Sequence, residues 1–120
     1  MAVKLFDSER RVMEVLWQAG EDLPAREIAR RLAESVGWNK NTTYTVIKKC
    51  VEKGAIAREE PGFLCRALLD REAVRAQAAE ELVEKVFDGS ASLLFASLLG
   101  GRPLPREEVR RLKELVDRLE

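Results

Sequence analysis

The stretch from Gly37 to Ile56, GWNKNTTYTVIKKCVEKGAI, combines the residue spacing of a buried helix with a wholly polar opposite face. Its helix is predicted to begin at Asn39 or Asn41, because asparagine is favoured at helix N-caps, and to end at Gly54, a good C-cap residue. The inward-facing residues recur at helical spacing and are Thr43, Val46, Ile47, Cys50 and Val51. The helix therefore presents lysine, asparagine, threonine and one tyrosine away from the core.

Two further helices are predicted before this stretch. The segment DSERRVMEVLWQAG (7–20) begins with the cap candidates Asp7 and Ser8 and ends at Gly20. The segment LPAREIARRLAESVG (23–37) places Pro24 at a helix start and a glycine at its end. Only the short turn VGWN separates the second and third helices, so these two helices cross at a large angle.

After the third helix the periodicity changes. The segment AIAREEPGFLCRAL (55–68) contains two short apolar runs around a Glu-Glu-Pro-Gly turn and predicts a small β-hairpin. A long helix from about Asp70 to Phe87 follows, then a short apolar helix, ASLLFASLL (91–99). The breaker GGRPLP (100–105) separates it from a last amphipathic helix, REEVRRLKELVDRL (106–119).

Three helices followed by a hairpin are the element order of a winged helix-turn-helix. The predicted fold is thus mostly α, with a winged-helix DNA-binding domain at residues 1–70 and a three-helix dimerisation region at residues 71–120. The third helix of such a domain projects one whole face outward.

That outward face predicts DNA binding. The chain as a whole is neutral, with 21 basic and 21 acidic residues, but the segment from Trp38 to Lys53 holds four lysines against the single acid Glu52. Lysines, hydroxyls and amides are the groups that contact phosphates and base edges. The candidate DNA-binding residues are Lys40, Asn41, Thr42, Tyr44, Thr45, Lys48 and Lys49. The alternative is an ordinary solvated face, with Tyr44 packed beneath the hairpin.

The C-terminal half predicts a homodimer. The 50 residues after Asp70 are too few to build a stable core alone. They nevertheless carry more apolar surface than the small first domain could cover, so a symmetric second copy is the economical partner. The candidate dimerisation residues are Val74, Ala78, Leu82, Val86, Leu93, Leu94, Leu98, Leu99, Val109, Leu112, Val116 and Leu119. The alternative is a monomer whose last helices fold back on the winged helix.

The composition argues against an enzyme. The chain has no histidine, which removes every Ser-His and Cys-His arrangement, and it has no Gly-rich phosphate loop. The two cysteines, Cys50 and Cys65, form no CxxC motif and are expected to be small buried residues, so neither a metal nor another cofactor is predicted. No apolar run approaches the ~18 residues of a membrane span and no signal-peptide pattern is present, which predicts a cytoplasmic protein without membrane insertion.

Three segments together carry a family resemblance: RRVMEVLW in the first helix, AREIARRL in the second, and GWNKNTTYTVIKKCVEKGAI. They resemble the penicillinase-repressor family of bacterial transcriptional regulators, over nearly the whole chain. The resemblance implies homodimeric repressors with an N-terminal winged helix and a C-terminal three-helix dimerisation region. It also implies that repression ends when a membrane sensor-protease triggers cleavage in the C-terminal region.

Carried onto this chain, the DNA-reading positions of the family fall on the seven candidate residues named above. Relatives often have Ser-Pro or a lysine ahead of the first threonine, where this chain has Asn39-Lys40-Asn41, so its operator preference can differ. The C-terminal cysteine clusters of copper-responsive members are missing, which argues against metal sensing. Anchoring on VFDGS (86–90) places the cleaved pair at Ser97-Leu98.

The predicted function is a DNA-binding transcriptional repressor that acts as a homodimer on a pseudo-palindromic double-stranded DNA operator. Derepression is predicted to follow cleavage within SASLLFASLLGG (90–101), where Gly100-Gly101 offers a weak end; the alternative for this segment is a purely structural helix. The alternative for the whole chain is a winged-helix module that docks on a protein without reading DNA sequence.

Overall fold

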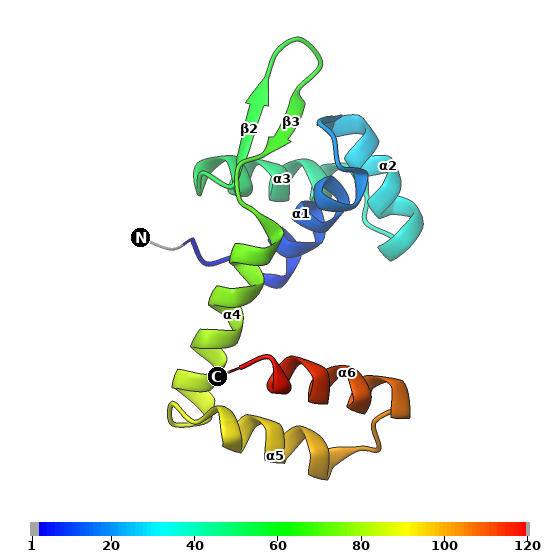
Figure 1. Cartoon of the computed structure of the whole chain (residues 1–120). Helices are drawn as coiled ribbons and strands as arrows, with labels where there is room; N and C mark the ends of the chain where they lie inside the picture. Colours follow the sequence, from blue (N-terminus) through cyan, green and yellow to red (C-terminus); the bar gives the residue numbers. More distant parts are fainter. Residues whose placement is uncertain (1–2, 120) are drawn as a thin grey trace. The chain divides into compact units, whose positions relative to one another are not determined.

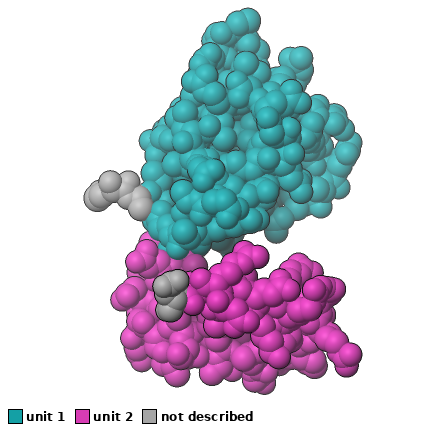
Figure 2. All heavy atoms as spheres, viewed as in Figure 1, with its two compact units in different colours: residues 1–77 teal, residues 78–120 magenta. Residues whose placement is uncertain are grey.

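The computed structural model describes residues 3–119, which form six helices and three short strands (Figure 1). In chain order these are α1 (Asp7–Ala19), β1 (Leu23–Pro24), α2 (Ala25–Val36), α3 (Lys40–Glu52), β2 (Ile56–Glu59), β3 (Leu64–Ala67), α4 (Arg71–Val86), α5 (Ala91–Gly101) and α6 (Arg106–Asp117). The chain divides into two compact units, the first ending at Gln77 and the second beginning at Ala78 (Figure 2). The mostly helical fold and the order of its elements agree with the prediction.

The first unit has a single hydrophobic core. Each of α1, α2 and α3 contributes one helical stripe to it, and the sheet closes it. The core residues are Val12, Met13, Leu16, Leu23, Ala25, Ile28, Leu32, Val46, Ile47, Cys50, Ala55, Ile56 and Cys65. Burial of these stripes is the main force that holds the three helices and the hairpin together.

The sheet contains one strand more than the sequence predicts. The predicted hairpin is present as the antiparallel pair β2–β3, and β1 adds to the other edge of β3, giving the order β1-β3-β2. Leu23 is paired with Cys65, and the Ala25 amide donates to the Phe63 carbonyl at 3.0 Å. A two-residue strand containing a proline leaves no periodic pattern in a sequence, which is why β1 was not predicted.

The N-cap predicted for the first helix is wrong by one or two residues. Asp7 is already the first helical residue, and the cap position belongs to Phe6. The Phe6 amide donates to Oε1 of Glu9 at 2.7 Å, so a carboxylate three residues later satisfies the free amide. Asp7 instead forms a salt bridge with Arg10.

The helix before the predicted breaker GGRPLP (100–105) ends at Gly101, two residues later than the predicted end at Leu99. Helix α5 runs through both glycines, and its cap is Arg102, with φ −159° and ψ 153°. Glycine lowers helix stability without forbidding the helix, whereas the residue before a proline is driven to extended backbone. The stop is therefore set by Pro103.

The second unit has no hydrophobic interior of its own. Among residues 78–119 no side chain is fully buried. Large apolar side chains that stay exposed in it are Leu82, Val86, Leu93, Phe95, Leu98, Leu99, Leu115, Val116 and Leu119. Across residues 3–119, no helix is both long enough and apolar enough to cross a membrane.

One buried ion pair joins the end of α3 to the start of α1. The Glu9 side chain is 1% exposed, and its Oε1 lies 2.6 Å from Nζ of Lys53. The same Nζ donates to the Lys4 carbonyl at 2.8 Å and lies 4.0 Å from the centre of the Phe6 ring. Burial raises the pKa of the Glu9 carboxyl, but the hydrogen bonds from Lys53 and Phe6 and the charges of Lys53 and Lys49 outweigh it, so the net pKa lies below its ordinary value.

We expect Lys53→Met to lower the free energy of unfolding at pH 7 by about 3 kcal/mol, the lower end of the range for a broken buried pair because Lys53 is partly exposed. Because the folded pKa of Glu9 is depressed, the contribution of the pair is present above the ordinary carboxyl pKa and is lost as pH falls through the folded value. Urea denaturation at several pH values measures both effects. Lys48→Met, at an exposed lysine on the same helix, is the control, and an equal loss in both variants would contradict the prediction.

Candidate nucleic-acid interface

Helix α3 begins at the predicted Asn39 cap, but its C-cap residue is Lys53, one residue before the predicted Gly54. The Asn39 side chain caps it by accepting the Thr42 amide at 2.8 Å. Its last residue is Glu52, and Gly54 follows with φ 80°, a left-handed conformation that turns the chain toward β2. Four of the five predicted inward residues are buried, and Val51 is half-buried.

The opposite face of α3 is open. Six of the seven predicted DNA-binding residues are exposed: Lys40, Asn41, Thr42, Thr45, Lys48 and Lys49. The seventh, Tyr44, is half-buried and packs against the core, with Nζ of Lys40 lying 5.5 Å from the centre of its ring. Tyr44 therefore lies at the boundary between the buried and the open face of α3.

The lysines of this face are not neutralised by neighbouring carboxylates. Within residues 3–119, none of the three α3 lysines forms a salt bridge, whereas Lys53, the C-cap residue after the helix, pairs with Glu9. Lys40, Lys48 and Lys49 thus direct three unpaired positive charges outward from one helix, which is the charge arrangement that attracts phosphate.

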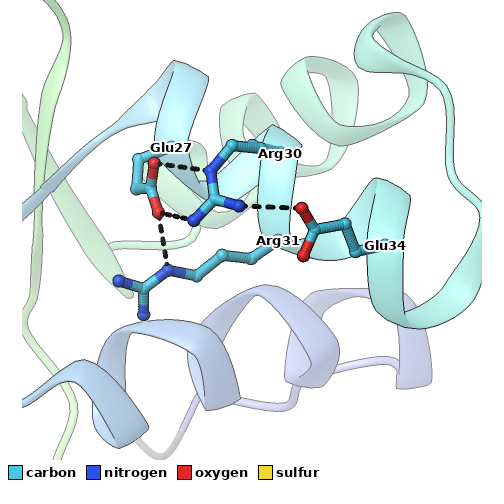
Figure 3. A network of polar contacts seen from close by, with 4 residues as sticks. All are labelled: Glu27, Arg30, Arg31 and Glu34. Atoms are coloured by element: carbon cyan, nitrogen blue, oxygen red, sulfur yellow. Dashed lines mark hydrogen bonds and ion pairs between the residues drawn. The ribbon is translucent and has the colours of Figure 1, made fainter.

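Helix α2 shows the opposite arrangement (Figure 3). The Glu27 carboxylate accepts Nε and Nη2 of Arg30 at 3.0 and 2.6 Å, and Nε of Arg31 at 2.8 Å. Nη1 of Arg30 reaches Oε1 of Glu34 at 2.8 Å. These four side chains balance one another on their own helix, so among the charged residues of α2 only Arg26 is left without a partner within residues 3–119, whereas α3 carries three such lysines.

The hairpin carries two arginines that the sequence reading did not single out. Arg58 on β2 and Arg66 on β3 are both exposed, and the Arg66 guanidinium lies 3.2 Å from Oε1 of Glu59. The Arg58 guanidinium lies 5.1 Å from the centre of the Phe63 ring. Both arginines lie in the two strands of the predicted hairpin. Because the hairpin of a winged helix lies at the surface, this position could have indicated that the two side chains are exposed.

The other titratable groups do not form a reactive or metal-binding site. Burial raises the pKa of the Cys50 thiol to about 12 and also raises that of Cys65, so both are protonated thiols inside the core. Among residues 3–119 no group of three or more histidine, cysteine or acidic side chains is placed to hold a metal ion.

A three-helix core, a third helix with a free polar face, and a β2–β3 hairpin define a winged helix-turn-helix. The family model described as penicillinase repressor matches residues 5–118, and the chain belongs to this family. As a member it is a DNA-binding transcriptional repressor and not an enzyme.

A solved structure has the same fold. The chain is similar to the structure titled "Solution structure of the DNA binding domain of the repressor BlaI", with a TM-score of 0.54 and 23% sequence identity. The match covers 59% of this chain and 88% of that one. A comparison with curated proteins found no match.

The α2 network predicts a pH dependence of stability. The hydrogen bonds from Arg30 and Arg31 lower the pKa of Glu27 from 4.5 to about 2. Because the folded pKa is depressed, the stabilisation by Glu27 is complete above pH 4.5 and is lost as pH falls toward 2. We expect Glu27→Gln to have a lower urea midpoint than the parent chain at pH 7, with the difference closing across that window.

The control for this prediction is Glu34→Gln, which removes a single contact at a side chain that is 69% exposed. Its effect on the urea midpoint is expected to be smaller. A Glu27→Gln difference that stays constant from pH 7 to pH 2.5 would show that the network does not stabilise the fold.

Proposed function

We propose that this repressor acts as a homodimer that places one α3 helix from each subunit in successive major grooves of a pseudo-palindromic operator. The observation that carries the proposal is the open face of α3, which presents three unpaired lysines among amide and hydroxyl groups. A helix face whose one acid, Glu52, lies at the last residue of the helix is suited to approach DNA through its earlier turns.

The residues of that face divide into two roles. Lys40, Lys48 and Lys49 supply phosphate contacts, which fix the register of the helix on the duplex. The shorter polar side chains read base edges, Asn41 through its amide and the threonines through their hydroxyl and methyl groups. Tyr44 is half-buried and packs against the core, so it helps to fix the position of α3 relative to the rest of the domain.

A dimer is favoured by two independent considerations. The second unit exposes many large apolar side chains, and a second copy of the same helices would cover them. Of the predicted dimerisation residues, Ala78, Leu82, Val86, Leu93, Leu98, Leu99, Val116 and Leu119 are exposed, and Val74, Leu94, Val109 and Leu112 are half-buried. A chain of zero net charge also gains little general attraction to DNA, so two linked half-sites are needed for tight binding.

Derepression by proteolysis is proposed at Ser97-Leu98 in α5. Both side chains are exposed, but the bond lies inside a helix, so a protease must first unwind the segment. Gly100 and Gly101 weaken the turn that follows and lower the cost of that unwinding. Cleavage would detach α6 from the rest of the chain and reduce the avidity of the dimer for its operator without changing α3. The proposed trigger is a membrane sensor-protease system.

The rival proposal is that the α3 face docks on a protein. Binding to DNA through phosphates has a signature that protein docking lacks, because the affinity falls steeply with salt, by about 10³ to 10⁵ between 50 and 200 mM for 6–10 contacts.

We expect Lys48→Ala and Thr45→Ala to weaken DNA binding in different ways. Lys48→Ala should weaken binding to every sequence and reduce the slope of affinity against salt by about 1 per subunit. Thr45→Ala should change the preferred base at one position of each half-site, by about 1–3 kcal/mol. Fluorescence anisotropy on a duplex selected by the parent chain from a random-sequence pool measures both.

Lys113→Ala, at an exposed lysine of α6, is the matched control and should leave both quantities unchanged. If Lys48→Ala, Thr45→Ala and the control all bind as the parent chain does, α3 is not the reading helix.

We expect the full chain to sediment at about twice its 13.6 kDa mass at micromolar concentration. A chain that ends at Ser97 should be monomeric, keep the folded first unit, and lose about 10² to 10⁴ in operator affinity, because only the linkage between half-sites is removed. Circular dichroism verifies the fold of the shortened chain. Unchanged affinity after truncation would rule out this mode of derepression.

A further inference from the structure

Three contacts attach the start of α4 and the residue Leu69 before it to α1. Nε1 of Trp17 donates to the Leu69 carbonyl at 2.9 Å, across 52 positions of sequence. Nη2 of Arg71 lies 3.0 Å from Oε2 of Glu14, and its guanidinium lies 5.8 Å from the centre of the Trp17 ring. Glu14 and Trp17 are one helical turn apart and therefore share a face of α1. We call these four residues the α1–α4 latch.

The segment that the latch binds, at the start of α4, is also held by local hydrogen bonds. Asp70, between the two latch residues of this segment, accepts the Ala73 amide on its side chain at 3.1 Å and the Val74 amide on its carbonyl at 3.1 Å. The first turn of α4 is thus capped as well as anchored, so the latch fixes where α4 begins and the direction of its first turn.

The Arg71 side chain is more buried than that of a typical surface arginine, and its position is therefore more restricted. Its side chain is 29% exposed, and its Nε atom is buried without a hydrogen-bond partner among the described residues. By contrast, Arg75, one turn further along α4, is 61% exposed and pairs with Glu72 of its own helix. The fold accepts an unpaired polar atom at Arg71, which indicates that the contacts to Glu14 and Trp17 compensate for it.

The latch connects two parts of the molecule that have different roles. Helix α1, which holds Glu14 and Trp17, also packs against α3 in the core and is bonded to the end of α3 through Glu9 and Lys53. Helix α4 continues from Arg71 to Val86 without a glycine or proline, past Gln77 where the first unit ends. The latch therefore ties the orientation of α3 to the first turn of the helix that leads into the second unit.

We propose that Trp17 and Arg71 are positioning residues that set the separation of the two α3 helices in the dimer, and hence the half-site spacing that the repressor accepts. The inference rests on the proposed dimeric function. Half-sites in a palindromic operator are read together only when their spacing matches that of the two reading helices. Loosening the start of α4 frees that separation while leaving both the dimer contacts and α3 intact.

The test compares Arg71→Met with Arg75→Met, two equal substitutions one turn apart on the same helix. The full-length dimers are titrated against a set of duplexes that carry the half-sites selected by the parent chain, with the spacer lengthened or shortened one base pair at a time. The parent chain and Arg75→Met should prefer one spacing sharply. Arg71→Met should reduce the ratio between the best spacing and its neighbours about 5-fold or more, while sedimentation still shows a dimer.

Two further variants separate positioning from folding. Trp17→Phe keeps an aromatic ring against the core but removes the hydrogen-bond donor together with the five-membered ring of the indole, so it should weaken the spacing preference, and circular dichroism checks that the chain stays folded. The double variant Glu14→Arg with Arg71→Glu restores an ion pair of reversed polarity and should recover part of the preference that each single change loses.

The outcomes are distinguishable from failure of the proposed function. A parent chain that selects no duplex would overturn the proposed function and the inference together. A parent chain that binds with a sharp spacing preference, which Arg71→Met and Trp17→Phe both retain, would overturn the inference alone and leave the latch a purely structural contact of the first unit.

Discussion

The structure depends on one constraint, which is that α3 must serve as core and as surface at the same time. Thr43, Val46, Ile47 and Cys50 are buried against the neighbouring elements, whereas Thr45, Lys48 and Lys49, which lie between them in the sequence, are exposed. Because side chains three and four positions apart share a face of a helix, one stripe of α3 can be held in the core while the opposite face stays free. The cost is visible at Thr43, whose hydroxyl is buried without a hydrogen-bond partner among the described residues.

The other features of the first unit support that helix at its ends and beneath it. The Asn39 cap fixes its start, the Glu9–Lys53 pair fixes its end, and Tyr44 lies between its two faces. Glu9 is a buried carboxylate whose partner is half-shielded, so the pair contributes more to the placement of α3 than to stability relative to an apolar alternative. In the neighbouring helix α2, Glu27 and Glu34 engage the guanidinium groups of Arg30 and Arg31, so the charges of these two arginines are balanced within the helix.

The sequence was sufficient to predict the elements whose residues repeat with a clear period. The three helices of the first unit, the hairpin and the three later helices were predicted in the right order, and the outward positions of α3 followed from the same period. Strand β1 was missed because two residues have no period, and the Phe6 cap was missed because its donor is satisfied by Glu9, three residues away. The latch was also out of reach, since Trp17 and Leu69 are 52 positions apart and one partner is a backbone carbonyl. In the second unit, apolar periodicity indicated which side chains form the apolar faces of the helices, but not which surface packs against those faces.

The open face of α3 carries a local positive charge, although the net charge of the whole chain is zero. At physiological ionic strength the electrostatic field of this face is screened over a distance of about 8 Å. Attraction to DNA is therefore significant only when the face is almost in contact with it. A strongly basic repressor is held along the whole chromosome by long-range attraction and finds its target by sliding. This chain gains little from that route, so in the proposed dimeric mode its occupancy of an operator would follow the concentration of intact dimers in free solution. A small loss of dimer would then be felt at the operator directly, without a reservoir of DNA-bound protein to replace it.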